Sequence, residues 1–109
     1  MPGVEVVAFS VLLFCAATAH ANPDDPYYRL IYDYEVASFC GLVKSPVHRA
    51  YKEKRRDLEV SSDLSPKELT QIRVGAMADA EREYINRGLG GHKPWCRNQG
   101  MAGIGRIVE

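Results

Sequence analysis

The sequence SPKELTQIRVGAMADAEREYINR, residues 65–87, decides the fold of this chain because it predicts one long amphipathic helix. Ser65 can cap the first turn, Pro66 suits the first helical position, and Glu68 completes a capping box with Ser65. Apolar residues recur at helical spacing and form one stripe, which consists of Leu69, Ile72, Ala76, Met77, Ala80 and Tyr84. Gly88 suits the residue that follows a helix end. Because an apolar stripe must be covered, we expect this helix to pack against other helices.

Two segments upstream begin with the same combination of a capping residue and a proline. Asp25-Pro26 starts a segment, residues 26–40, that is apolar around most of its circumference and is followed by Gly41. We expect it to be the central helix. Ser45-Pro46 starts a second helix, which runs to about Val60 and carries charged pairs at i,i+4 spacing on its outer side.

The links between these three segments are short, which makes sequential helices antiparallel neighbours. The sequence therefore predicts an all-α fold: a small three-helix up-down-up bundle with a short C-terminal helical turn around Trp95. The glycine-rich tail, residues 100–109, is expected to be either a flexible end or a segment that docks on a partner.

The first 21 residues have the features of a secretory signal peptide. An apolar run from Val6 to Ala19 is followed by Ala19-His20-Ala21, a small-x-small cleavage pattern. The run of about 14 residues is shorter than the roughly 20 that a membrane span needs, which favours cleavage over a permanent anchor. We therefore expect a periplasmic or secreted protein consisting of residues 22–109, with no stable membrane span after cleavage. The general form resembles many short exported helical proteins of Gram-negative bacteria.

Composition indicates one globular domain, with 46% hydrophobic residues and a formal net charge of zero, so a nucleic-acid partner is not expected. A domain this small is marginal without a covalent link. Cys40 and Cys96 remain after cleavage, and in an oxidising compartment they are expected to form a disulfide. The up-down-up order brings both cysteines to one end of the bundle. On the chain-entropy model the link contributes roughly 4 kcal/mol.

Catalytic and metal sites are poorly supported by the sequence. Asp79 and Glu83 share a helix face, which is the minimum for acid–base chemistry, but each has an arginine within helical reach. His92 and Cys96, with Cys40 and His48, could ligate a metal only if the sulfurs were reduced. Neither an enzymatic activity nor a cofactor is therefore expected.

The leading functional hypothesis is a non-enzymatic interaction protein or accessory subunit of a cell-envelope complex, of unknown oligomeric state. Tyrosines surround the first helix, and one helix in a three-helix bundle cannot bury its whole circumference, so Tyr28 and Tyr32 are expected to face a protein partner. Leu89, His92 and Trp95 in the following loop would extend this surface. The alternative is a small-ligand or metal-binding periplasmic module that uses His92, Trp95 and Cys96.

Overall fold

The computed structural model describes residues 22–87 and 91–109, and within them the regular secondary structure is all helical, with no strand. The helices are α2 (Pro26–Phe39), α3 (Ser45–Ser61), α4 (Pro66–Ile85), α5 (Lys93–Trp95) and α6 (Met101–Val108), with a π-helical turn, η1 (Cys96–Gly100), joining the last two. The all-α prediction is confirmed. The expected signal peptide, residues 1–21, and Leu89 lie outside the described residues.

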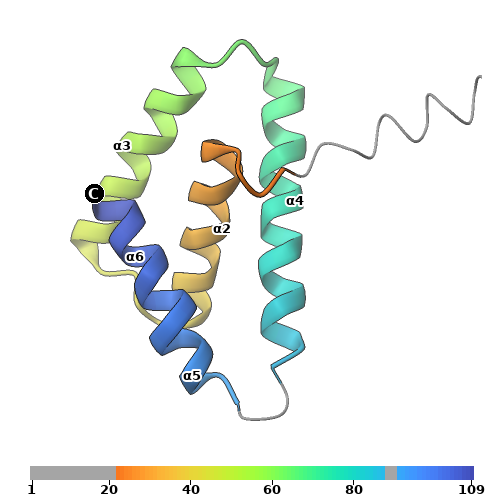
Figure 1. Cartoon of the computed structure of the whole chain (residues 1–109). Helices are drawn as coiled ribbons and strands as arrows, with labels where there is room; N and C mark the ends of the chain where they lie inside the picture. Colours follow the sequence, from red (N-terminus) through yellow and green to blue (C-terminus); the bar gives the residue numbers. More distant parts are fainter. Residues whose placement is uncertain (1–21, 88–90) are drawn as a thin grey trace, which may run out of the picture.

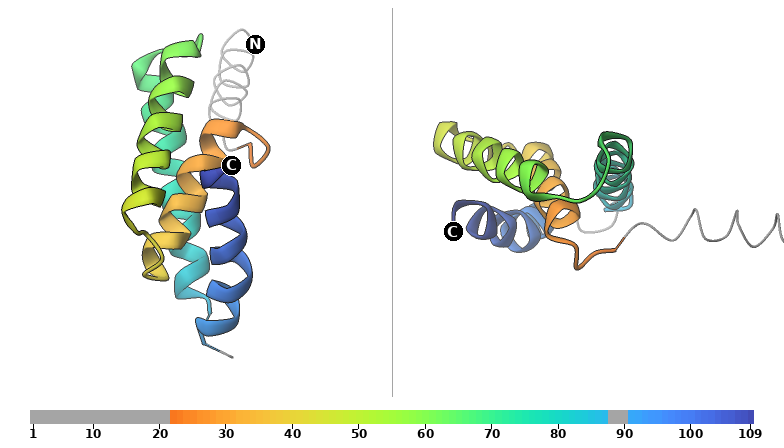
Figure 2. Two further views of the ribbon diagram at one scale, coloured as in Figure 1. Left: turned by 90° about the vertical axis from the view of Figure 1, so that its left-hand side faces the viewer. Right: turned by 90° about the horizontal axis from the view of Figure 1, so that it is seen from above.

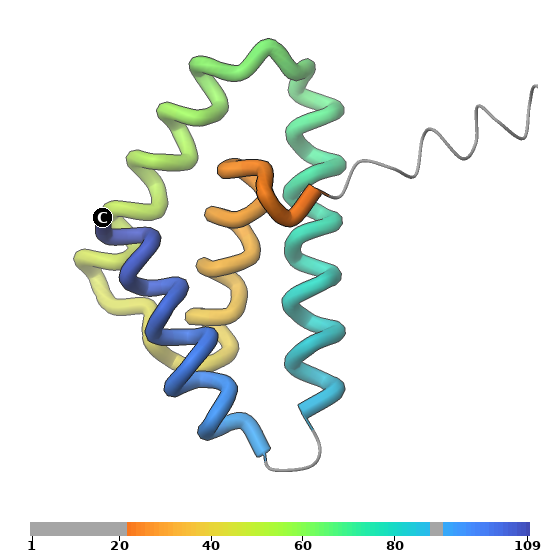
Figure 3. The backbone as a smooth tube through the Cα atoms, viewed as in Figure 1, coloured from red at the N-terminus to blue at the C-terminus, as the bar shows by residue number. Residues whose placement is uncertain are grey.

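Helix α2 is the centre of the molecule. It packs against α3, α4 and α6, and the view from above shows α4 on one side of it with α3 and α6 on the other (Figure 2). The backbone trace shows that α2, α3 and α4 run in alternating directions, as expected (Figure 3). Most of the core residues on this helix are aromatic or branched: Tyr27, Tyr28, Leu30, Ile31, Tyr32 and Val36.

Local signals fix the helix ends. The Asp25 carboxylate accepts a hydrogen bond from the Tyr27 amide at 2.9 Å, and Ser65 and Glu68 form the predicted capping box. Gly41 has φ +68°, and the bonds from Gly41 N to Ser38 O and from Leu42 N to Ala37 O complete a Schellman motif. The expected cap at Ser45 is wrong, because α3 begins at Ser45 itself and Lys44 precedes it without a side-chain bond.

The C-terminal segment differs from the prediction. Instead of a short turn followed by a tail, α5, η1 and α6 form a fourth helix that is continuous from Lys93 to Val108 (Figure 1). Glycine is a poor helix former, but two of the glycines lie in close contact with α2 or with the residues that follow it. A Cβ atom on Gly100 would lie 2.9 Å from Leu42 Cδ1, and one on Gly103 would lie 3.2 Å from Asp33 Cβ. Close packing and the burial of Ile107 therefore outweigh the low helix propensity.

The predicted disulfide between Cys40 and Cys96 is confirmed, with a Cα–Cα distance of 5.5 Å. It joins the end of α2 to the start of the fourth helix, at the end of the bundle where α4 also finishes (Figure 1). This link and the close packing of Gly100 position α6 along α2. No helix among the described residues is long and apolar enough to cross a membrane.

Candidate functional site

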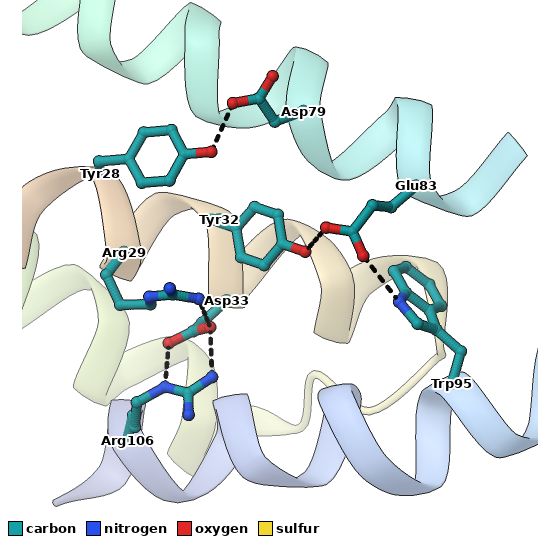
Figure 4. Close-up of polar contacts among 8 residues, drawn as sticks. All are labelled: Tyr28, Arg29, Tyr32, Asp33, Asp79, Glu83, Trp95 and Arg106. Atoms are coloured by element: carbon teal, nitrogen blue, oxygen red, sulfur yellow. Dashed lines mark hydrogen bonds and ion pairs between the residues drawn. The ribbon is translucent and has the colours of Figure 1, made fainter. Parts of the chain in front are cut away.

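A groove of about 540 Å³ lies where α2, α4 and the fourth helix meet. Its residues come from all three elements and from the segment before α2, and they are Pro23, Tyr28, Arg29, Tyr32, Glu83, Gln99 and Arg106. Figure 4 shows the polar contacts that form its walls. We call this feature the central groove.

The wall between α2 and α4 is built from tyrosine–carboxylate hydrogen bonds. The Tyr28 hydroxyl donates to Asp79 and the Tyr32 hydroxyl donates to Glu83 (Figure 4). Burial, together with the bond to Asp79, raises the pKa of Tyr28 to about 12, and burial with the bond to Glu83 raises the pKa of Tyr32 as well. Both hydroxyls therefore remain protonated donors across the physiological pH range.

The expectation that Tyr28 and Tyr32 form an exposed stripe is wrong. Each is only 6% exposed, because α4 covers this side of α2 and supplies a carboxylate for each hydroxyl. The sequence argument allowed for two neighbouring helices around α2, whereas the structure has three. The two tyrosines contribute ring surface to the wall of the central groove rather than an outward-facing patch.

The wall between α2 and α6 is an ion pair with one buried partner. Asp33 is 2% exposed and accepts from Arg106 at both oxygens, Oδ2 from Nε at 2.8 Å and Oδ1 from a terminal nitrogen at 2.9 Å. The Arg29 guanidinium approaches Asp33 at 3.8 Å and lies 5.3 Å from the centre of the Tyr32 ring. Arg106 is therefore the main partner of Asp33, and Arg29 is a secondary one.

The charges around the central groove leave one cation in excess. Three carboxylates lie in or beside it, and each has its own arginine: Asp33 with Arg106, Asp79 with Arg82, and Glu83 with Arg87. Arg29 is a fourth arginine, and its side chain is 37% exposed. The groove thus offers a solvent-accessible guanidinium beside a tyrosine ring, which suits a carboxylate or another anion.

Trp95 and its neighbours connect the groove to the end of the bundle. Trp95 is buried, and its indole N–H donates to Glu83 at 3.4 Å. His92 is exposed and stacks on Tyr84, with the ring centres 4.3 Å apart. Trp95 therefore packs against the end of the bundle, whereas His92 faces solvent.

The four side chains weighed as metal ligands do not come together in the structure, although His92 and Trp95 both pack on Tyr84. Cys96 is bonded to Cys40, and His48 instead contacts the Tyr34 hydroxyl at 2.8 Å. Among residues 22–87 and 91–109, no group of three or more His, Cys, Asp or Glu side chains is arranged to hold a metal ion.

The residues that sequence reasoning missed are Arg29, Asp33, Gln99 and Arg106. A signal for the first two was present, since Arg29 and Asp33 have i,i+4 spacing within a largely apolar helix. Nothing in the sequence pointed to Arg106, because the tail that carries it was expected to be a flexible end or a docking segment.

Comparison with known proteins returned no match: no family model, no curated protein and no solved structure corresponds to this chain.

Proposed function

We propose that this protein is an exported, non-enzymatic interaction protein or accessory subunit of a cell-envelope complex, and that its central groove receives an acidic side chain of a protein partner. The observation that carries the proposal is the partly exposed Arg29 guanidinium, whose contact with Asp33 is secondary because Arg106 already donates to both Asp33 oxygens. The other two carboxylates around the groove pair with Arg82 and Arg87. The apolar leader and its cleavage pattern support the periplasmic or secreted location.

Two arginines would share the incoming carboxylate. Arg106 uses Nε and one terminal nitrogen to hold Asp33, which leaves its other terminal nitrogen available, and its side chain is 43% exposed. Arg29 lies against the Tyr32 ring and is therefore partly ordered before binding. A carboxylate between these groups would make charge-assisted hydrogen bonds, which are stronger than neutral ones.

The internal hydrogen bonding favours binding over catalysis. Asp79 and Glu83, the carboxylates weighed as an acid–base pair, both accept from buried tyrosines and pair with arginines. A general base must reach a substrate proton with a free lone pair. These carboxylates instead join α4 to α2, so their role is structural in this proposal.

A site-specific photo-crosslinker in place of Gln99 tests the proposal, because this exposed residue lines the groove. The full chain is expressed in its native cells, and adducts are identified by mass spectrometry. We expect one protein adduct that is lost in Arg29→Gln, while Asp33 keeps Arg106 and the variant stays folded. Arg49→Gln removes the same charge from exposed α3 and should leave the adduct unchanged. The proposal is overturned if no protein adduct forms, or if both variants lose it equally.

The central groove, rather than His92, Trp95 and Cys96, is the feature of the structure that favours the alternative function, a small-ligand module. A volume of about 540 Å³ lies within the usual range for small-molecule sites. Native mass spectrometry of the protein purified from the envelope fraction distinguishes the two functions. A bound small molecule that is displaced in Arg29→Gln supports the alternative, whereas the bare protein mass argues against it.

A further inference from the structure

A second cavity lies away from the central groove, between the C-terminal part of α3 and the N-terminal part of α4. Figure 1 shows these two helix ends joined by the short link at the top of the molecule. The cavity has a volume of about 450 Å³, and three arginines line it: Arg55, Arg56 and Arg73. We call it the basic cavity.

The charges that line the basic cavity are unbalanced. Glu59 is the one acidic lining residue, and it accepts from the Tyr27 hydroxyl at 2.5 Å and from Arg55 Nε at 2.9 Å, while Arg73 approaches it at 3.7 Å. Burial alone would raise the pKa of Glu59, but the bonds from Tyr27 and Arg55 outweigh burial and lower it, so this carboxylate is ionised at neutral pH. Three guanidinium groups and one carboxylate leave two positive charges in excess.

Two of the arginines are held in place before any ligand binds. Arg73 donates to the Tyr27 hydroxyl at 3.1 Å and to Thr70 Oγ1 at 3.3 Å, and Arg55 is fixed by Glu59. The third, Arg56, makes no ion pair within residues 22–87 and 91–109, and it is exposed. The cavity therefore combines two ordered guanidinium groups with one whose charge is not compensated.

The remaining lining is largely apolar. Leu69 and Val60 both line the cavity; Leu69 is buried, whereas Val60 is 80% exposed. An exposed valine beside arginines could contact a hydrocarbon chain while the arginines bind an anion. This combination is typical of sites that hold the headgroup and the first carbons of a charged lipid.

We propose that the basic cavity binds a phosphate group, either as the free ion or as the headgroup of a phosphate-bearing lipid. A phosphate carries a charge of about −1.5 to −2 at neutral pH, which is close to the two excess positive charges. The planar guanidinium fork matches phosphate oxygens in bidentate geometry, and Arg56 is free to close over the bound group.

Binding is measured on the full chain as purified from cells, with its disulfide intact. One arm titrates inorganic phosphate while the arginine Nε–H signals are followed by NMR. The other arm measures co-sedimentation with phosphatidylcholine vesicles, with and without phosphatidic acid. Arg56→Gln is the test variant, because Arg56 makes no hydrogen bond or ion pair within residues 22–87 and 91–109, and Arg49→Gln is the control with the same change in charge.

We expect Arg56→Gln to weaken binding about tenfold or more, since it removes a charge-assisted hydrogen bond, and Arg49→Gln to change it less than about twofold. Shifts with inorganic phosphate alone identify the free ion as the ligand, and sedimentation that requires phosphatidic acid identifies the lipid. The proposal is overturned if neither probe binds, or if Arg49→Gln weakens binding as much as Arg56→Gln, since binding then follows net charge and not the cavity.

Discussion

Replacing Arg106 with alanine should destabilise the protein strongly, because Asp33 would keep its charge in a site that is 2% exposed. Removing one partner of a buried ion pair typically costs about 3–5 kcal/mol. The Arg106 side chain is 43% exposed, and Arg29 lies 3.8 Å from the same carboxylate. Water and this second cation therefore reduce the free-energy cost of removing Arg106. We expect a decrease of about 2–3 kcal/mol in the free energy of unfolding, or a Tm about 10–20 °C lower.

Reversible urea unfolding followed by far-UV circular dichroism, without reductant, measures this change. Arg97→Ala is the matched control, since Arg97 is an exposed arginine in the same continuous helix. The double variant Asp33→Leu, Arg106→Met removes both charges and should recover most of the loss, because apolar replacements of buried ion pairs are often neutral. If Arg106→Ala unfolds within about 0.5 kcal/mol of the wild type, the pair does not hold α6 on α2.

Three further outcomes are expected. Gly105 faces open space, so Gly105→Ala should stabilise the protein by about 0.5–1 kcal/mol. Gly103→Ala should destabilise it, because the new Cβ atom would lie 3.2 Å from Asp33 Cβ. The midpoints of urea unfolding measure both effects. Burial raises the pKa of Glu35. The protonated Glu35 therefore contributes fully to folding stability below the unfolded pKa of about 4.3, and this contribution is lost as pH rises through the folded pKa. The Tm of Glu35→Gln should be higher than that of the wild type at neutral pH and equal to it below about pH 4. Burial and the bonds to α4 raise the pKa of Tyr28 from 10.0 to about 12 and also raise that of Tyr32, so the contribution of these two hydroxyls to folding stability is present below pH 10 and lost at higher pH. An absorbance titration should show that these two tyrosines ionise last. One common transition near 10 for all six tyrosines would contradict the buried hydrogen bonds.

Much of the fold could be predicted because its determinants are local. The caps at Asp25 and Ser65 and the glycine at position 41 act within a few residues, and the apolar stripe of α4 specifies which side must be covered. The disulfide followed from helix order and compartment rather than from any contact. These arguments need only the spacing of residue types along the chain and the order of the helices, and both can be read from a sequence.

The fourth helix could not be predicted in this way. The segment from Gly100 to Glu109 combines glycines with isolated apolar residues, and in isolation that composition favours a flexible chain. Its helix is stable because the bare surfaces of Gly100 and Gly103 fit against Leu42 and Asp33, contacts that are long-range in sequence. A glycine chosen for close packing is indistinguishable in sequence from one chosen for flexibility.

The error in the candidate site has two sources. The predicted helix α4 covers Tyr28 and Tyr32 and bonds both hydroxyls, but the sequence does not say which side of α2 it covers. The fourth helix, which was not predicted, adds a third neighbour to α2. With α6 in place, Arg106 reaches Asp33, Arg29 becomes secondary to it, and the groove over Tyr32 acquires its surplus positive charge. The site that the structure offers for binding therefore depends on one helix whose position is set by two glycines and a disulfide. For this reason, variants that loosen α6, such as Gly103→Ala, should weaken the proposed binding of an acidic partner at Arg29 even though they leave Arg29 itself intact.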